Sequence, residues 1–157
     1  MLHECRPADL SIVTDPSRLD LDVIHGFLSR SSYWAAGIPR ELVARALRHS
    51  ICFGAFDGNE QVGFARVISD HATFAYVCDV FVLDSHRGRG VGKQLMAAVK
   101  SHPDLQGLRR WVLFTRDAHE LYRQFGFSEA RHPDRLMEIQ SGPYPAAAAA
   151  REGEPTA

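Results

Sequence analysis

Three glycines and two arginines stand close together in the segment 82–92, which reads V-L-D-S-H-R-G-R-G-V-G. An apolar run precedes this segment and a helical pattern follows it, so the glycines fall where a strand turns into a helix. Glycine has no Cβ atom, so a ligand can approach the backbone closely and the chain can adopt positive φ angles. The first N–H groups of a helix lack intrahelical partners and carry the positive end of the helix dipole. The segment therefore predicts a binding site for phosphate groups.

Two common phosphate-binding motifs do not fit this segment. The dinucleotide fingerprint G-x-G-x-x-G requires a glycine at the position of Lys93, and the Walker motif requires serine or threonine at the position of Gln94. What remains is the pattern R-x-x-G-x-G, from Arg87 to Gly92, directly after a strand that ends in valine. A glycine-rich turn that only connects two elements would give the same pattern.

A second motif follows one helix and one strand later. Residues 118–127 read A-H-E-L-Y-R-Q-F-G-F, which is similar to the A-x-x-L-Y-x-x-x-G-F segment of the GNAT superfamily of N-acetyltransferases. The R-x-x-G-x-G pattern resembles the acetyl-CoA loop of the same superfamily. The resemblance implies an α/β (α+β) protein with the GNAT fold, in which about four helices flank a mixed central sheet of about six to seven strands. It also implies direct acetyl transfer from acetyl-CoA to an amine, without a metal.

The resemblance assigns acetyl-CoA to the loop and to the strand before it. In the family the loop amides bind the CoA pyrophosphate, while the strand pairs with the pantetheine arm and offers an N–H to the thioester carbonyl. The residues implied are Val80, Phe81, Val82, Arg87, Gly88, Arg89, Gly90, Val91, Gly92 and Thr115. Two positions depart from the family pattern, because Asp84 replaces a frequent proline and Thr115 a frequent asparagine. A threonine hydroxyl either caps the next helix or reaches less far toward the pantetheine.

Acetyl transfer to an amine needs an acid for the leaving thiolate and a way to deprotonate the ammonium. Tyr122 falls on the general-acid position of the family, and the alternative is a tyrosine packed on the sheet with its hydroxyl bonded to a neighbour. Asp79 is the expected base if a β-bulge turns it from the opposite face of its strand toward the acceptor. A structural aspartate satisfied by backbone amides is the alternative. His119, Glu120 and a base acting through water stay open.

Tyr33 and Trp34 lie between the first two expected helices, where this fold places part of its acceptor site. They are expected to form an aromatic wall there, although Trp34 also suits a cover over the core. No run of acidic residues is present to line a groove for a Lys-rich peptide. We therefore expect a small amine or amino-acid-like acceptor, with Arg30 or another arginine for its carboxylate. A protein lysine or N-terminal amine, and an acyl-CoA-binding module without turnover, are the alternative functions.

Apolar runs and helical spacing predict the elements that position these residues. Strands are expected at 10–13, 51–56, 62–68, 74–83 and 111–114, with weaker signals at 127–130 and 136–139, and helices at 21–28, 39–49, 91–102 and 117–124. The segment D-G-N-E-Q between the second and third strands predicts a hairpin. Residues 1–140 are expected to form a single domain, and residues 141–157 a low-complexity tail rich in proline and alanine.

Composition narrows the partners and the compartment. The 157 residues include 18 Lys and Arg against 19 Asp and Glu, a net charge of −1 that does not favour nucleic acid or an anionic membrane as a partner. The three cysteines are far apart and lack C-x-x-C spacing, which predicts neither a disulfide framework nor a zinc site. No signal peptide or membrane-spanning run is visible. We expect a cytoplasmic protein, and a homodimer is left open.

Overall fold

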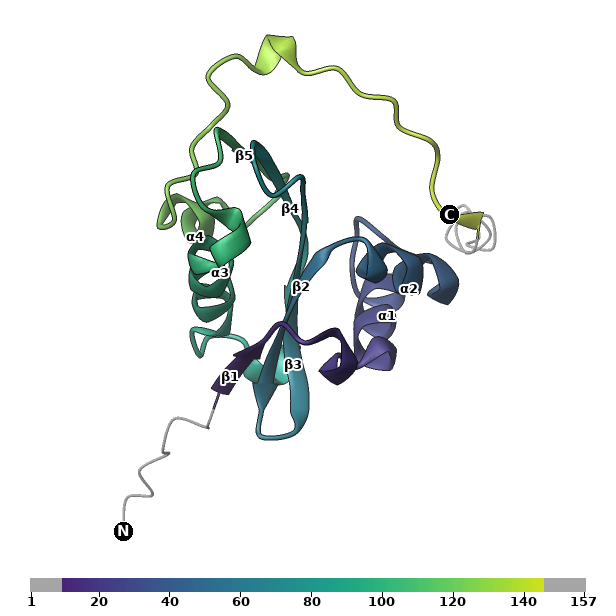
Figure 1. Cartoon of the computed structure of the whole chain (residues 1–157). Helices are drawn as coiled ribbons and strands as arrows, with labels where there is room; N and C mark the ends of the chain where they lie inside the picture. Colours follow the sequence, from purple (N-terminus) through teal and green to yellow (C-terminus); the bar gives the residue numbers. More distant parts are fainter. Residues whose placement is uncertain (1–9, 146–157) are drawn as a thin grey trace.

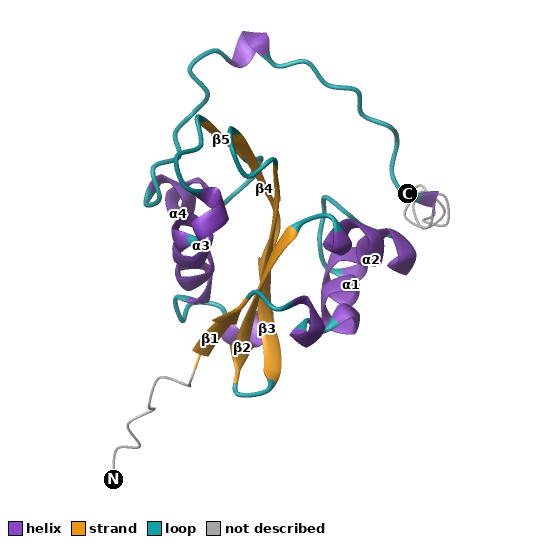
Figure 2. Ribbon diagram, in the orientation of Figure 1, coloured by secondary structure: helices purple, strands orange, loops and turns teal. Residues whose placement is uncertain are grey.

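The computed structural model describes residues 10–145 and contains a five-stranded sheet between two layers of helices (Figures 1 and 2). The strands are β1 (Leu10–Val13), β2 (Ile51–Asp57), β3 (Glu60–Ser69), β4 (Phe74–Val82) and β5 (Arg110–Val112), and the helices are α1 (Leu21–Arg30), α2 (Arg40–Arg48), α3 (Val91–Ser101) and α4 (His119–Arg123). The strand order is β1-β2-β3-β4-β5, with antiparallel neighbours except for the parallel pair β4 and β5. Helices α1 and α2 cover one face, and α3 and α4 cover the other.

Each face of the sheet has its own apolar core. Ile24 and Leu28 of α1 pack with sheet residues on one face, and Leu95 and Val99 of α3 are fully buried on the other. These pairs stand four residues apart, so each pair lies on one side of its helix. The α1–α2 connection therefore lies with the helix layer on one face of the sheet. The loop from Arg87 to Gly92, here called the glycine loop, leads into α3 on the other face.

Strands β4 and β5 separate soon after they meet. Pairing covers only Phe74–Tyr76 of β4 and Arg110–Val112 of β5. Strand β4 continues to Val82, and among the described strands β3 is its only partner over that length. The edge of β4 that precedes the glycine loop is therefore open on its β5 side.

A bulge in β4 decides which way Asp79 faces. The register between β3 and β4 shifts beside Asp79, where β4 has one residue more than β3. Asp79 has φ = 53°, in the left-handed region. Val77 and Val80, three residues apart, consequently both pack against the α3 core, while the Asp79 side chain contacts Trp34 of the α1–α2 connection. The bulge that Asp79 needs in order to face away from the α3 core is therefore present.

The end of the described chain differs from the expectation. Neither 127–130 nor 136–139 forms a strand, so the sheet has five strands in the described residues instead of six to seven. Phe127 instead packs its ring edge against Trp111, with 6.3 Å between centroids, and a short 3₁₀ turn, Pro133–Arg135, breaks the extended chain. Tyr144 in the expected tail is half-buried against the α1–α2 core, and residues 146–157 lie outside the described part. No helix within 10–145 is long and apolar enough to cross a membrane.

Candidate active site

The glycine loop has the geometry expected of an anion-binding turn. Gly88 and Gly90 have φ angles of 75° and 77°, which only glycine adopts readily. A Cβ atom at either position would meet no other atom within 4 Å, so both face open space. The N–H groups of residues 88–93 donate no hydrogen bond to the described chain, and no side chain caps α3. These groups are therefore available to phosphate oxygens.

Arg87 is exposed and stabilises the loop from its surface. Its Nε donates to the carbonyl oxygen of Val82 at 3.2 Å, and its guanidinium pairs with Asp84 at 3.0 Å. Asp84, which departs from the family pattern, thus holds an arginine of the motif in place. Arg89 is exposed beside the loop. Of the two arginines, Arg89 is the better placed to add charge to a bound phosphate.

In the strand before the loop, the side chains are used in packing, so mainly backbone groups remain available to a ligand. Val80 and Val82 pack against the α3 core, and Phe81 turns to the other face, where its ring stacks on that of an α1 phenylalanine with centroids 4.1 Å apart. Thr115 accepts a hydrogen bond at Oγ1 from the N–H of Ala118 at 3.0 Å. Of the two possibilities for Thr115, the hydroxyl caps the turn that leads into α4.

Tyr122 is buried but keeps its hydroxyl open. The residue is 8% exposed, and its ring lies edge-on to Phe127 at 6.0 Å. The hydroxyl has no hydrogen-bond partner in residues 10–145, and no fully buried polar side-chain atom there lacks a partner, so the hydroxyl reaches solvent. Burial, followed by the nearby Tyr33 and Asp117, raises the pKa of Tyr122 to about 12. The alternative in which the Tyr122 hydroxyl is hydrogen-bonded to a neighbouring residue is therefore not seen in the described residues.

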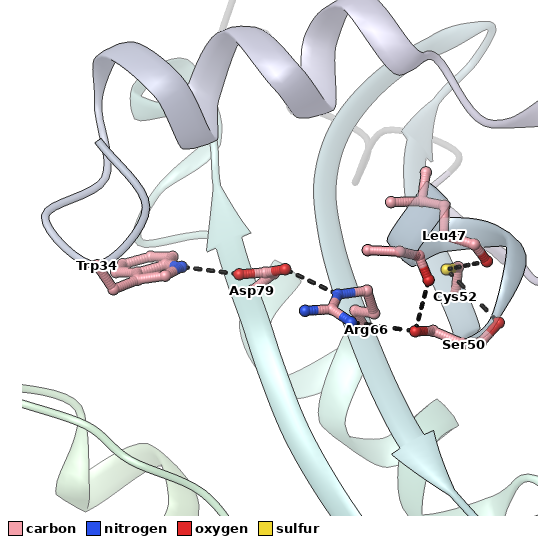
Figure 3. A network of polar contacts seen from close by, with 7 residues as sticks. Trp34, Leu47, Ser50, Cys52, Arg66 and Asp79 are labelled. Atoms are coloured by element: carbon pink, nitrogen blue, oxygen red, sulfur yellow. Dashed lines mark hydrogen bonds and ion pairs between the residues drawn. The ribbon is translucent and has the colours of Figure 1, made fainter. Parts of the chain in front are cut away.

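Asp79 lies at the centre of a polar network (Figure 3). Its Oδ1 accepts from Trp34 Nε1 at 2.9 Å, and its Oδ2 accepts from Arg66 Nε at 2.8 Å. Arg66 Nη1 donates in turn to Ser50 Oγ at 3.1 Å. The side chains of Asp79 and Arg66 are only 12% and 15% exposed, so this is a largely buried ion pair. Both carboxylate oxygens of the expected base are therefore engaged by protein donors.

Arg66 keeps one guanidinium nitrogen unused. Nη2 has no partner among residues 10–145 and is the nitrogen without a dashed line in Figure 3. Because no fully buried polar side-chain atom of the described chain lacks a partner, Nη2 is open to solvent. The flanking thiols are poor nucleophiles, since burial raises the pKa of Cys52 to about 11 and that of Cys78 to about 12. The group beside Asp79 that can still bind a ligand is thus the free guanidinium nitrogen of Arg66, which is a hydrogen-bond donor.

Tyr33 ties the α1–α2 connection to the chain that follows β5. Its hydroxyl accepts from the backbone N–H of Arg116 at 3.2 Å, and the Arg116 guanidinium carbon lies 3.9 Å from the centre of its ring. The rings of Tyr33 and Trp34 meet edge to face at 5.0 Å. Because Trp34 bonds Asp79, the two aromatic residues bridge the bulge of β4 and the segment that leads to Tyr122.

Comparison with known proteins assigns the family. Residues 48–129 match the model of the acetyltransferase (GNAT) domain. A protein of the fungus Gibberella zeae, provisionally named an acetyltransferase, is 35% identical over 154 aligned positions, which cover 83% of this chain and 86% of that protein. The chain belongs to the GNAT superfamily. A GNAT-family protein of Xanthomonas campestris pv. campestris, also provisionally described as an acetyltransferase, is 56% identical with a TM-score of 0.82, and the match covers 84% of this chain and 93% of that one. A GNAT protein of Streptococcus pneumoniae is 25% identical with a TM-score of 0.64, and the match covers 85% of this chain and 98% of that one.

The GNAT resemblance drawn from the two motifs is thereby confirmed, and the structure brings most of the expected site residues together. The aromatic pair Tyr33 and Trp34 reaches both Asp79 and the neighbourhood of Tyr122. Glu120, an alternative base, instead pairs with an arginine of its own helix.

Arg66 and Arg116 are the groups that sequence reasoning missed. Arg66 lies in β3 and Arg116 in the loop after β5, and neither belongs to a recognisable sequence motif. The only available signal was that Arg66 interrupts an apolar strand, where a charge needs a partner.

Proposed function

We propose that this GNAT protein is an acetyl-CoA-dependent N-acetyltransferase whose acceptor is a small amino-acid-like amine. The observation that carries the acceptor class is the Arg66–Asp79 pair, with one donor nitrogen of Arg66 left open. A carboxylate and a guanidinium side by side match the two ends of a zwitterion. Because Arg66 neutralises Asp79, the pair offers little net attraction to a Lys-rich peptide.

Acetyl-CoA fits the other side of β4. The open N–H groups of residues 88–93 and the exposed Arg89 would hold the phosphates, and the free edge of β4 up to Val82 would pair with the pantetheine arm. When bound, acetyl-CoA supplies a thioester whose acetyl group passes to the acceptor amine. The chain must position that amine, supply a proton for the departing sulfur and exclude water.

Tyr122 holds the proton for the departing sulfur at Oη. Its pKa is raised to about 12, so the hydroxyl remains protonated throughout the neutral range. The pKa of an ordinary thiol is lower than that of this phenol, so complete proton transfer from Tyr122 to a free thiolate is uphill. The hydroxyl therefore acts while the C–S bond breaks, by donating a hydrogen bond to the negative charge that develops on sulfur, and a phenolate formed by any transfer regains its proton from water.

Asp79 acts as a positioning residue in this scheme. Each carboxylate oxygen has two lone pairs and uses one on Trp34 or Arg66, so a lone pair remains for the acceptor amine. The proton that the ammonium loses then passes to water at the site. Trp34 contributes one polar contact to this arrangement and one aromatic surface beside it.

The test of the acceptor class uses paired substrates. The enzyme is incubated with labelled acetyl-CoA and a pool of amino acids, the corresponding decarboxylated amines, and a separate protein mixture. We expect label on amino acids above all, because they satisfy both Asp79 and Arg66. Label mainly on protein would instead support protein acetylation, and no transfer with retained acetyl-CoA binding would support a binding module.

Arg66→Lys refines the same test. Lysine keeps a positive charge for Asp79. It lacks the planar guanidinium, whose third nitrogen is free to bind a carboxylate when the other two are used within the protein. The KM for amino-acid acceptors should rise by about tenfold or more, the loss expected for one charge-assisted hydrogen bond, while the KM for the decarboxylated amines should change little. An equal rise for both substrate classes would remove Arg66 from carboxylate recognition.

The two cysteines of the described chain, Cys52 and Cys78, are unpaired. They face each other across Arg66 on three neighbouring strands, with one strand between them, and a separation of two strand spacings is about 9 to 10 Å, too far for a disulfide. We infer that the enzyme works in a reducing compartment such as the cytoplasm.

A further inference from the structure

The segment that follows α4 leaves its apolar side chains in water. All residues from 128 to 143, here called the arm, are exposed. Leu136, Met137 and Ile139 are 59%, 94% and 100% exposed, although such side chains are normally buried. Residues 137–143 also make no backbone hydrogen bond within the described chain. The arm thus combines exposed apolar side chains with unpaired backbone N–H and C=O groups. Both are features of a β-strand that has not paired with a sheet.

The arm is held at both ends by its own chain. Phe127 packs against Trp111 and Tyr122 at its start, and Tyr144 is half-buried against the α1–α2 core at its end. Between these points the arm runs outside the sheet, from the α4 side of the molecule toward the α1–α2 side (Figure 1). Its own chain therefore holds the apolar segment 136–139 away from the sheet.

The sheet has a matching unpaired edge at β5. Strand β5 is the last strand of the sheet in the described residues and pairs only with β4. Phe114, just beyond it, is 61% exposed. Arg109 and Arg110 at its start are exposed, and Glu138, the one charged residue of the segment 136–139, has the opposite charge. A short edge with exposed aromatic surface is open to an added strand.

We propose that the arm of a second copy of this chain adds residues 136–139 as a strand to β5. The donor segment and the acceptor edge occur on the same chain, so a two-fold arrangement satisfies both copies reciprocally. In such a strand Met137 and Ile139 lie on one face and cover apolar surface together. The root of the arm packs on Trp111 of β5, whereas β1 lies at the far edge of the sheet, so a two-fold axis beside β5 would bring the root of each arm near the acceptor edge of the other copy. The proposal does not depend on acetyl transfer.

The first experiment measures the molar mass by light scattering at micromolar concentration for the full chain and for two neighbouring variants. We expect the wild type to have twice the chain mass. Ile139→Asp should weaken the dimer at least about a hundredfold, because it places an unpaired charge in the covered face. Gln140→Asp adds the same charge one residue on, facing the other way, and should leave the dimer intact. A wild type with the mass of one chain, or an equal effect of both variants, would overturn the proposal.

A second experiment separates exchange between copies from pairing within one chain. One chain carries Met137→Cys or Ile139→Cys, and a differently tagged chain carries Arg110→Cys or Val112→Cys, each with Cys5→Ser. We expect oxidation of the mixture to join the two tagged chains in at least one combination. If both substitutions on one chain form only intrachain disulfides, at a rate independent of dilution, the arm closes on its own sheet and the proposal is wrong.

Discussion

The glycine loop provides the most direct test of the proposed acetyl-CoA site. Gly90 and Gly107 have similar positive φ angles, 77° and 69°, and a Cβ atom at either position would meet no other atom within 4 Å. Alanine at either position should therefore cost the same backbone strain, about 1 to 2 kcal/mol. In a protein of this size that corresponds to a fall in Tm of about 2 to 8 °C. Only Gly90 lies in the loop of open N–H groups.

The ligand response distinguishes the two variants. Acetyl-CoA at a hundredfold excess over its Kd stabilises a native protein by about 2.7 kcal/mol, or about 5 to 11 °C in Tm. We expect this shift in the wild type and in Gly107→Ala. Gly90→Ala should lose most of it, and Gly90→Val should lose all of it, because the added carbons occupy the space of the phosphates. Differential scanning fluorimetry with and without acetyl-CoA measures both effects. A full shift in Gly90→Val would refute the assignment of the loop.

Three further predictions concern the catalytic side of β4. Tyr122→Phe should lower kcat by about 10² to 10⁴ with little change in acetyl-CoA affinity, and a steady-state assay with calorimetric binding checks this. Because the pKa of Tyr122 is raised to about 12, kcat should show no falling basic limb up to about pH 10.5, whereas a limb near pH 10 would indicate an ordinary phenol. Arg66→Met should destabilise the fold by about 3 to 5 kcal/mol by leaving Asp79 unpaired, and the added change Asp79→Asn should restore part of this in urea unfolding.

Local patterns predicted the parts of the fold that depend on nearby residues. The strand, glycine turn and helix around Gly88 and Gly90 could be placed because apolar periodicity changes there from strand to helix. The helix with Tyr122 was found in the same way, although the ordered α4 is shorter than expected. The segment 136–139 was wrongly expected to be a strand of this sheet, because its apolar composition favours a strand wherever an edge is available. Composition cannot tell which edge that is.

Long-range partners could not be read from the sequence. Arg66 lies 13 residues before Asp79 and Trp34 lies 45 residues before it, yet both bond its carboxylate. That convergence depends on the register of β3 and β4 and on the packing of the α1–α2 connection over the sheet. Asp79 was expected to be the base because of its position in the sequence alone. Because two protein donors bind its carboxylate, we propose instead that it positions the acceptor amine.

The bulge at Asp79 connects the two halves of the proposed site. Without it, strict alternation from Val77 would point Asp79 into the α3 core, where Val80 and Val82 now pack. The left-handed φ of 53° costs about 1 kcal/mol or more for a residue other than glycine. The extra residue turns Asp79 to Trp34 and Arg66 and keeps the apolar face of the strand before the glycine loop continuous. One local distortion thus places the Asp79 carboxylate on one face of β4 and preserves the apolar packing on the other face, beside the edge proposed to bind acetyl-CoA.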